Sequence, residues 1–161
     1  MNIPNARRET AYVALGANLG NASATLTQAF LDLGKLPQTM LVHRSSLYRT
    51  APIESSGPDY YNAVAEISTA LDPHGLLTAL QGLEKNAGRQ RPYRNAPRTL
   101  DLDILLYGDL QLDSPTLTIP HPRMLSRAFV LVPLAEIAPA RVTTVHLQGV
   151  EEQGIERLAD A

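Results

Sequence analysis

The spacing of hydrophobic residues along the chain predicts an alternation of strands and helices. A short apolar run at residues 12–15, ended by Gly16, fits a buried strand followed by a turn. After Asn21, a residue type that favours the start of a helix, apolar residues recur three and four positions apart as far as Leu33. This spacing predicts an amphipathic helix that ends near Gly34.

Two strands and a second helix are predicted next. Residues 40–50 and 60–71 are rich in β-branched and aromatic residues, and the SSGP sequence at 55–58 separates them. Asp72 followed by Pro73 is typical of a helix start, and leucines spaced three and four apart form the apolar stripe of the helix that follows. This helix is expected to end at Gly88, which follows the apolar stripe, because glycine often caps the C-terminus of a helix.

A strand at residues 100–107 completes the regular pattern, and the chain after about Gly108 is rich in proline and less regular. The order is therefore βαββαβ. It predicts an α+β protein with a ferredoxin-like core, in which a mixed or antiparallel sheet carries both helices on one face.

Composition narrows the class of protein. The 161 residues are 44% hydrophobic and 19% charged, with a formal net charge of -2, which is typical of an ordinary globular domain. We expect a flexible leader at 1–9, a single domain at 10–161 and a monomer by default. The absence of cysteine excludes disulfides and thiolate chemistry. No signal peptide and no run of 18 apolar residues is found, so a cytoplasmic protein with no membrane or nucleic-acid partner is expected.

Two aspartates interrupt the last strand. Asp101 and Asp103 are two positions apart, so both side chains lie on the same face of a strand, while Leu102, Ile104 and Leu106 are expected on the opposite face, toward the core. Like charges this close repel each other unless a cation lies nearby, and Mg²⁺ binds one or two carboxylates together with phosphate oxygens. The alternative is a solvated edge strand whose charges discourage aggregation.

An arginine-rich segment directly precedes the aspartates. The sequence GRQRPYRNAPR at 88–98 contains four arginines and neither lysine nor an acidic residue. Arginine favours planar, bidentate recognition of phosphate oxygens, although a solvated loop is an alternative. Together with the aspartates, it indicates a polyphosphate and metal site for phosphoryl or pyrophosphoryl transfer. The Walker A and protein-kinase motifs are absent.

Other polar and aromatic residues are weaker candidates. Tyr60 and Asn62 share a strand face and could stack on and hydrogen-bond a flat heterocycle, although a core tyrosine and an asparagine at a strand start are the commoner roles. Gln81 and Glu84 are neighbours on the second helix. His121 lies between two prolines, where it could bind metal or phosphate or have a structural role.

Several of these segments resemble one enzyme family. RNAPRTLDLDILLYG at 94–108 is similar to the signature of 6-hydroxymethyl-7,8-dihydropterin pyrophosphokinases, in which R-x-x-D-hydrophobic-D follows a basic residue. The order and approximate spacing of further segments also match that family: VALGANLG at 13–20, SSLYRTAPI at 45–53, PDYYNAV at 58–64, GRQR at 88–91 and TIPHPRMLSRAFVLVPLAEIAP at 118–139.

The resemblance implies a fold, a reaction and a cofactor. The fold is a three-layer αβα sandwich built on the ferredoxin-like core. The reaction, part of folate biosynthesis, transfers pyrophosphate from the co-substrate ATP to the hydroxymethyl group of the pterin and releases AMP. Asp101 and Asp103 resemble the pair that holds two Mg²⁺ ions against the triphosphate.

The resemblance also assigns the remaining site residues. By position, Arg91 and Arg94 resemble mobile catalytic-loop arginines that approach the phosphates. Those that resemble ATP-binding positions are Gln81, Glu84, Arg89, Arg98, Thr118, His121 and Arg127. Those that resemble pterin-binding positions are Thr50, Ile53, Tyr60, Asn62 and Phe129, with Tyr60 and Phe129 stacking on the two faces of the ring.

Two rival functions are weighed against the enzyme. A non-catalytic ferredoxin-like module that binds nucleotide or RNA through the arginines requires a basic surface and exposed aromatics, whereas the net charge is -2 and aromatics make up 5% of the chain. A degenerate relative of the enzyme is not expected to keep both the aspartate pair and the arginines. We therefore expect an active pyrophosphokinase.

Overall fold

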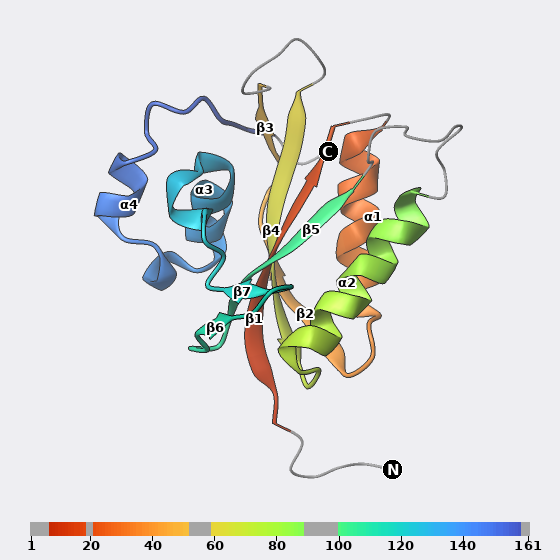
Figure 1. Ribbon diagram of the computed structural model, residues 1–161. Coiled ribbons are helices and arrows are strands. Elements are labelled where there is room, and N and C mark those ends of the chain that lie inside the picture. Colours follow the sequence, from red (N-terminus) through yellow and green to blue (C-terminus); the bar gives the residue numbers. More distant parts are fainter. Residues whose placement is uncertain (1–6, 19–20, 52–58, 89–99, 159–161) are drawn as a thin grey trace.

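The computed structural model describes residues 7–18, 21–51, 59–88 and 100–158, and their centre is an antiparallel sheet (Figure 1). Its strands follow the order β5-β1-β4-β3-β8, and β2 also pairs with β4. The bounds are β1 (Glu9–Ala17), β2 (Thr39–Arg44), β3 (Tyr48–Thr50), β4 (Tyr60–Thr69), β5 (Asp101–Tyr107) and β8 (Glu156–Arg157). Every pair within this sheet is antiparallel, as one of the two predicted alternatives requires.

Helices cover both faces of the sheet. Helices α1 (Ala22–Gly34) and α2 (Pro73–Gly88) pack side by side on one face, and α3 (Ala128–Ile137) and α4 (Thr144–Gln148) lie on the other (Figure 1). The three-layer αβα sandwich is therefore confirmed, and the predicted βαββαβ order holds except that the strand expected at 40–50 is divided into β2 and β3. None of the helices in the described part of the chain is long and apolar enough to cross a membrane.

The predicted helix starts are formed by the expected side chains. The Asn21 side-chain oxygen accepts the Ala24 N–H at 3.1 Å, and one Asp72 carboxylate oxygen accepts the Gly75 N–H at 2.7 Å. Each bond satisfies one of the N–H groups that a helix leaves unpaired in its first turn. Replacing such a cap by alanine typically costs about 1 kcal/mol of stability.

Strand β1 divides the core into two clusters. Val13 and Leu15 point toward α1 and α2 and are at most 2% exposed, whereas Tyr12 points toward α3 together with Val64 of β4. This alternation follows from the two-residue period of a strand. Each fully buried leucine or valine contributes about 1.5–3 kcal/mol, so β1 stabilises both layers at once.

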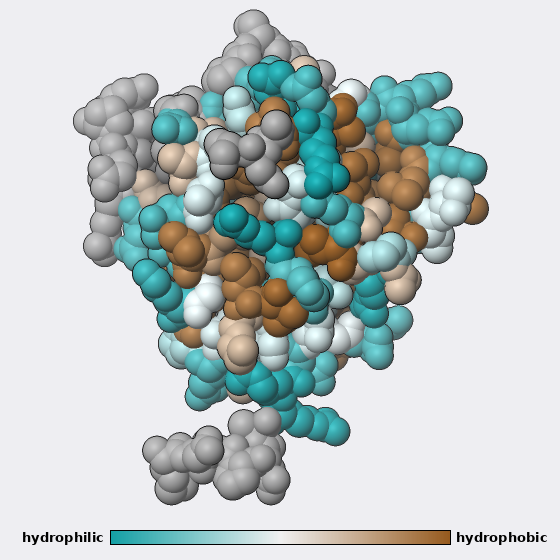
Figure 2. Space-filling view, turned by 180° about the vertical axis from the view of Figure 1, so that it is seen from behind, coloured by the Kyte–Doolittle hydropathy of each residue, from teal (hydrophilic) through white to brown (hydrophobic). Residues whose placement is uncertain are grey.

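On the face shown in Figure 2, the visible hydrophobic side chains lie in several separate groups among hydrophilic ones.

A bulge in β5 changes one expectation from the strand period. The simple alternation places Leu106 on the same core face as Leu102 and Ile104. In the structure the register between β1 and β5 shifts, so that Leu105 and Leu106 both join the cluster beneath α3. The expectation for Leu106 is wrong because one extra residue in a bulged strand reverses the faces that follow.

The strand expected at 40–50 is two strands, β2 and β3, separated by residues 45–47. Ser45 causes the break. Its N–H donates to the Val64 carbonyl at 2.9 Å, while its hydroxyl oxygen accepts the Val64 N–H at 2.9 Å. A side-chain oxygen thus replaces the backbone carbonyl in the ladder, and the chain leaves the regular strand path for the next two residues.

The segment after Gly108 contains more structure than its proline content suggests. A small hairpin of β6 (Leu112–Asp113) and β7 (Thr118–Ile119) is followed by two 3-10 turns, Met124–Ser126 and Pro139–Arg141, on either side of α3. Helix α3 escaped prediction because nine of its ten residues are apolar, which leaves no periodic stripe, and because Pro133 lies inside it.

Candidate active site

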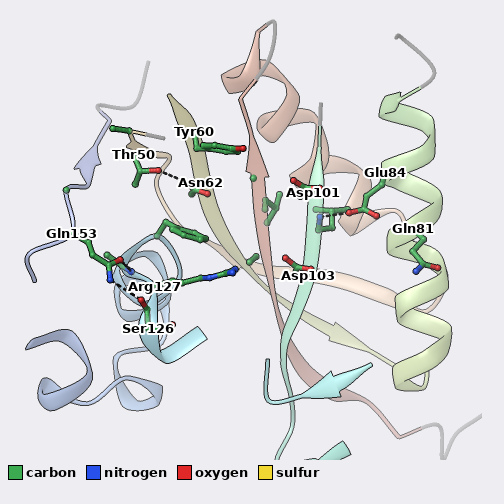
Figure 3. A pocket seen from close by; sticks show the side chains of 18 of the residues that line it. Thr50, Tyr60, Asn62, Gln81, Glu84, Asp101, Asp103, Ser126, Arg127 and Gln153 are labelled. Carbon is green, nitrogen blue, oxygen red and sulfur yellow. Dashed lines mark hydrogen bonds between the residues drawn. The ribbon is translucent and has the colours of Figure 1, made fainter. Parts of the chain in front are cut away.

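A cavity of about 1110 Å³ opens on the α3 face of the sheet (Figure 3). Residues from β1, β3, β4, β5, α2 and the start of α3 line it, together with the segment at 153–154. Pockets for a single small ligand usually measure about 300–1,000 Å³. The described part of this cavity therefore has room for more than one small molecule.

The two aspartates of β5 lie side by side in this cavity. Asp101 and Asp103 are both exposed, and both line the cavity from the same face of the strand (Figure 3). In the ladder they lie opposite Gly16 and Ala14 of β1. Because glycine and alanine are small, their side chains do not cover the two carboxylates, which are exposed on this face of β5.

Helix α2 supplies the wall next to the aspartates. Gln81 and Glu84 both line the cavity. One Glu84 carboxylate oxygen accepts a hydrogen bond from the Leu102 N–H at 2.8 Å. This N–H belongs to the edge strand β5 and points away from β1. Glu84 thereby fixes the stretch of β5 that lies between the two aspartates.

Thr50, Tyr60 and Asn62 form a second corner of the cavity. Asn62 is only 5% exposed, and its side-chain NH₂ donates to the Thr50 hydroxyl at 3.2 Å. A Cβ on Gly16 would lie 3.4 Å from the Asn62 side-chain oxygen, so Gly16 is directly beside the amide. Tyr60 is 40% exposed and presents its ring to the cavity (Figure 3). The corner combines an aromatic plane with an oriented amide, as a flat heterocycle requires.

The start of α3 brings a positive charge to the cavity. The Arg127 guanidinium carbon lies 5.3 Å from the centre of the Phe129 ring, a cation–π contact. The Arg127 side chain extends across the cavity toward Asp103 (Figure 3). A cation held at this position faces the carboxylates from the opposite wall and favours a bound anion between them.

The structure does not bring Thr118 and His121 to the lining of this cavity. Thr118 pairs with Asp113 in the small hairpin, and His121 lines a smaller neighbouring cavity while its N–H donates to the Leu105 carbonyl at 2.9 Å. Burial lowers the pKa of the His121 ring, against the opposing effect of the nearby Asp103 carboxylate. This favours the neutral ring beside the aspartate.

Some residues of the expected site lie outside the described residues: Ile53, Arg89, Arg91, Arg94 and Arg98. Within the ranges that the structure describes, no group of three or more histidine, aspartate or glutamate side chains is placed to hold a metal ion unaided. A metal bound at the aspartate pair would therefore take most of its ligands from water or substrate.

Gln153 also lines the cavity, although no feature of the sequence predicts this role. It lies in an irregular segment, and its side chain bonds to the backbone of residues more than twenty positions away. No periodicity or motif connects those positions.

Comparisons with known proteins agree with one another. A family model described as 7,8-dihydro-6-hydroxymethylpterin-pyrophosphokinase (HPPK) matches residues 12–139. A 2-amino-4-hydroxy-6-hydroxymethyldihydropteridine pyrophosphokinase of Pseudomonas aeruginosa is 45% identical over 157 residues, which cover 93% of this chain and 97% of the relative. A protein of the same name from Haemophilus influenzae is 49% identical over 130 residues, covering 80% of this chain and 81% of the relative.

Solved structures share the fold. The crystal structure of wild-type Plasmodium falciparum HPPK-DHPS with SDX-DHP superposes with a TM-score of 0.63 at 15% identity. The match covers 81% of this chain and 41% of that one, so this chain spans about two fifths of the solved protein. At that identity the likeness concerns the fold alone, and it agrees with the ferredoxin-like α+β architecture.

Proposed function

This chain belongs to the 7,8-dihydro-6-hydroxymethylpterin-pyrophosphokinase family, and from that premise we propose how its cavity performs the reaction. The chain is a pyrophosphokinase of folate biosynthesis that uses ATP as co-substrate. Membership of this family disfavours the rival non-catalytic binding module. The observation that carries the proposal is that an acidic pair and an aromatic, amide-bearing corner face the same cavity of about 1110 Å³.

The pterin is proposed to bind in the corner formed by Thr50, Tyr60 and Asn62. The buried Asn62 amide, oriented by its bond to Thr50, would hydrogen-bond the edge of the pterin. The rings of Tyr60 and Phe129 both line the cavity and would stack on the two faces of the heterocycle. By resemblance, the backbone of Thr50 and Ile53 would add hydrogen bonds.

The triphosphate of ATP is proposed to lie along β5. Asp101 and Asp103 would hold two Mg²⁺ ions, and the residues present fit this role, because both carboxylates are exposed, share one face and lie opposite small residues. Bound Mg²⁺ would neutralise the charge that develops on the phosphate oxygens. Arg127 would add positive charge from the opposite wall. Gln81 and Glu84 line the same cavity and would contact the nucleotide.

The transfer step would then depend mainly on position and charge. The pterin hydroxyl oxygen forms a bond to the β-phosphorus, the bond from that phosphorus to the α-phosphate oxygen breaks, and AMP leaves as the hydroxyl proton passes to solvent. Arg91 and Arg94 are proposed to approach the phosphates during this step. Arg89, Arg98, Thr118 and His121 remain proposed nucleotide-binding residues by resemblance alone, and the latter two would act from beside the cavity.

One experiment tests the proposed reaction. Purified protein is mixed with Mg-ATP and 6-hydroxymethyl-7,8-dihydropterin, and chromatography separates AMP from ADP. Pterin-dependent AMP is the expected product. ADP would instead indicate transfer of a single phosphoryl group, and the absence of nucleotide turnover would indicate a chain that has lost the activity of its family.

A further inference from the structure

Helix α3 begins at a residue that cannot cap it. Arg127 occupies the N-cap position with extended backbone angles, φ -127° and ψ 115°, and makes no side-chain capping bond. An arginine side chain has no hydrogen-bond acceptor, so it cannot satisfy the N–H groups of the first helical turn. The first of these, the Ala128 N–H, instead donates to the Gln153 side-chain oxygen at 2.9 Å.

The same Gln153 amide also binds the other side of Arg127. Its NH₂ group donates to the Ser126 carbonyl at 2.9 Å (Figure 3). One planar amide therefore bonds both to the residue before Arg127 and to the residue after it. The orientation of the amide is fixed, because the Ala128 N–H needs an acceptor, which is the amide oxygen, and the Ser126 carbonyl needs a donor, which is the NH₂ group. These bonds fix the backbone direction from which the arginine side chain starts.

The placement of Gln153 favours a role in the site over a purely structural one. The side chain is exposed and lines the active-site cavity, so burial of apolar surface contributes little to holding it there. Its own segment is held separately, by the Gln153 N–H bonding to the Val150 carbonyl at 3.0 Å and by the pairing of β8 with β3. The amide is thus a fixed support against which the 126–128 segment rests. It lies beyond residues 12–139, the range that the family model matches.

We propose that Gln153 is a positioning residue that holds Arg127 in the orientation needed to bind the triphosphate of ATP. The proposal rests on the proposed function, because it takes the anion between Arg127 and the aspartates to be the nucleotide. Gln153 acts through Arg127, and its loss weakens nucleotide binding without altering the pterin corner at Thr50 and Asn62.

The test measures nucleotide binding directly by calorimetry, with Mg²⁺ and an ATP analogue whose α,β-bridging oxygen is replaced by methylene. Gln153→Leu is expected to raise the Kd about three- to tenfold, as the loss of one or two neutral hydrogen bonds predicts. Gln148→Leu is the matched control, because it makes the same change at an exposed glutamine five positions away and is expected to leave the Kd unchanged. In Gln153→Leu the Kd of the pterin is expected to rise less than that of the analogue, because Phe129 follows the segment that Gln153 holds whereas Thr50 and Asn62 lie on other strands; in Gln148→Leu it is expected to stay unchanged.

The decisive comparison repeats Gln153→Leu in an Arg127→Ala background. If Gln153 acts through Arg127, the second substitution adds nothing there. An equal effect in both backgrounds, an unchanged Kd for the analogue in Gln153→Leu, a rise confined to the pterin Kd, or a wild-type chain that does not bind the analogue would each overturn the proposal. If Gln153→Leu does not fold, Gln153→Asn takes its place with the same expectations, because its shorter amide cannot reach both partners. Failure of the proposed function is seen separately, as the lack of pterin-dependent AMP from wild-type protein.

Discussion

The Glu136 carboxylate of α3 accepts a hydrogen bond from the Tyr48 hydroxyl of β3 at 2.7 Å, which joins the helix to the strand that carries Thr50. Glu136 also accepts bonds from the Ser46 N–H and hydroxyl, and Arg157 lies 3.3 Å away. Burial alone would raise the pKa of the Glu136 carboxyl. The bonds from Tyr48 and Ser46 and the charge of Arg157 outweigh burial, so the pKa is lowered. For Tyr48, burial and the bond to Glu136 raise the pKa of the hydroxyl.

Glu136→Gln should therefore destabilise the protein in a pH-dependent way. A carboxyl whose pKa is lower in the folded state stabilises it above the unfolded value, usually 4.5, and loses that effect as the pH falls through the folded pKa. The variant is expected to be less stable than wild type by about 2 kcal/mol at pH 7, as for hydrogen bonds to a charged group. Urea unfolding at a series of pH values measures the difference.

The matched control for this prediction is Glu152→Gln, which changes an exposed glutamate. Its stability is expected to follow wild type throughout the pH series. A gap between Glu136→Gln and wild type that stays constant down to low pH would mean that packing, and not the carboxylate charge, links α3 to β3.

The acidic pair should be needed for activity and not for folding. Asp101→Asn and Asp103→Asn are each expected to lower kcat by at least about 10²-fold, a typical loss when a group that balances transition-state charge is removed. Because both side chains are exposed, the free energy of unfolding should change by no more than about 0.5 kcal/mol. AMP formation and thermal unfolding give the two values. Asp113→Asn, an exposed aspartate of the small hairpin, should leave both unchanged.

Removal of divalent metal should stop the reaction without unfolding the chain. EDTA is expected to abolish pterin-dependent AMP formation, and an excess of Mg²⁺ to restore it, because the two carboxylates repel the like-charged triphosphate unless a divalent cation lies between them. The thermal transition should not move, since the described residues contain no metal-holding cluster on which the fold depends. Turnover that persists in excess EDTA would contradict the proposed metal role.

The pterin corner should respond to a single hydroxyl. Thr50→Val keeps the shape of the side chain but removes the acceptor for the Asn62 amide. The KM for pterin is expected to rise about three- to tenfold, while the KM for ATP stays near the wild-type value. Thr78→Val makes the same change on the exposed side of α2 and should alter neither constant. A rise in the KM for ATP alone would place the pterin elsewhere.

The local sequence was sufficient to predict the features that depend only on residues close together in the chain. The apolar stripe of α1 and the caps at Asn21 and Asp72 act within a few residues, and the structure confirms them. The shared face of Asp101 and Asp103 follows in the same way from the period of a strand. Local rules apply here because no distant partner is needed to decide the outcome.

Distant partners decided the features that the sequence did not predict. The bulge at Leu105 depends on the register with β1, and the break after Ser45 depends on the Val64 N–H that its hydroxyl accepts. Gln153 is tied to backbone groups at 126 and 128. In each case the partner is far away along the chain, so the residues next to the position do not show that the contact forms, and periodicity cannot predict it.

The pairing of β3 with β8 determines when one edge of the sheet closes during synthesis. Arg49 and Glu156, which face each other across the two strands, are 107 positions apart. Until residues 156–157 leave the ribosome, the outer N–H and C=O groups of β3 form an open edge to which another nascent chain can add a strand. Once in place, β8 presents two exposed charged residues outward. Within the described residues β8 is the last strand along the chain, so this edge of the sheet is covered only after nearly all of those residues have been made.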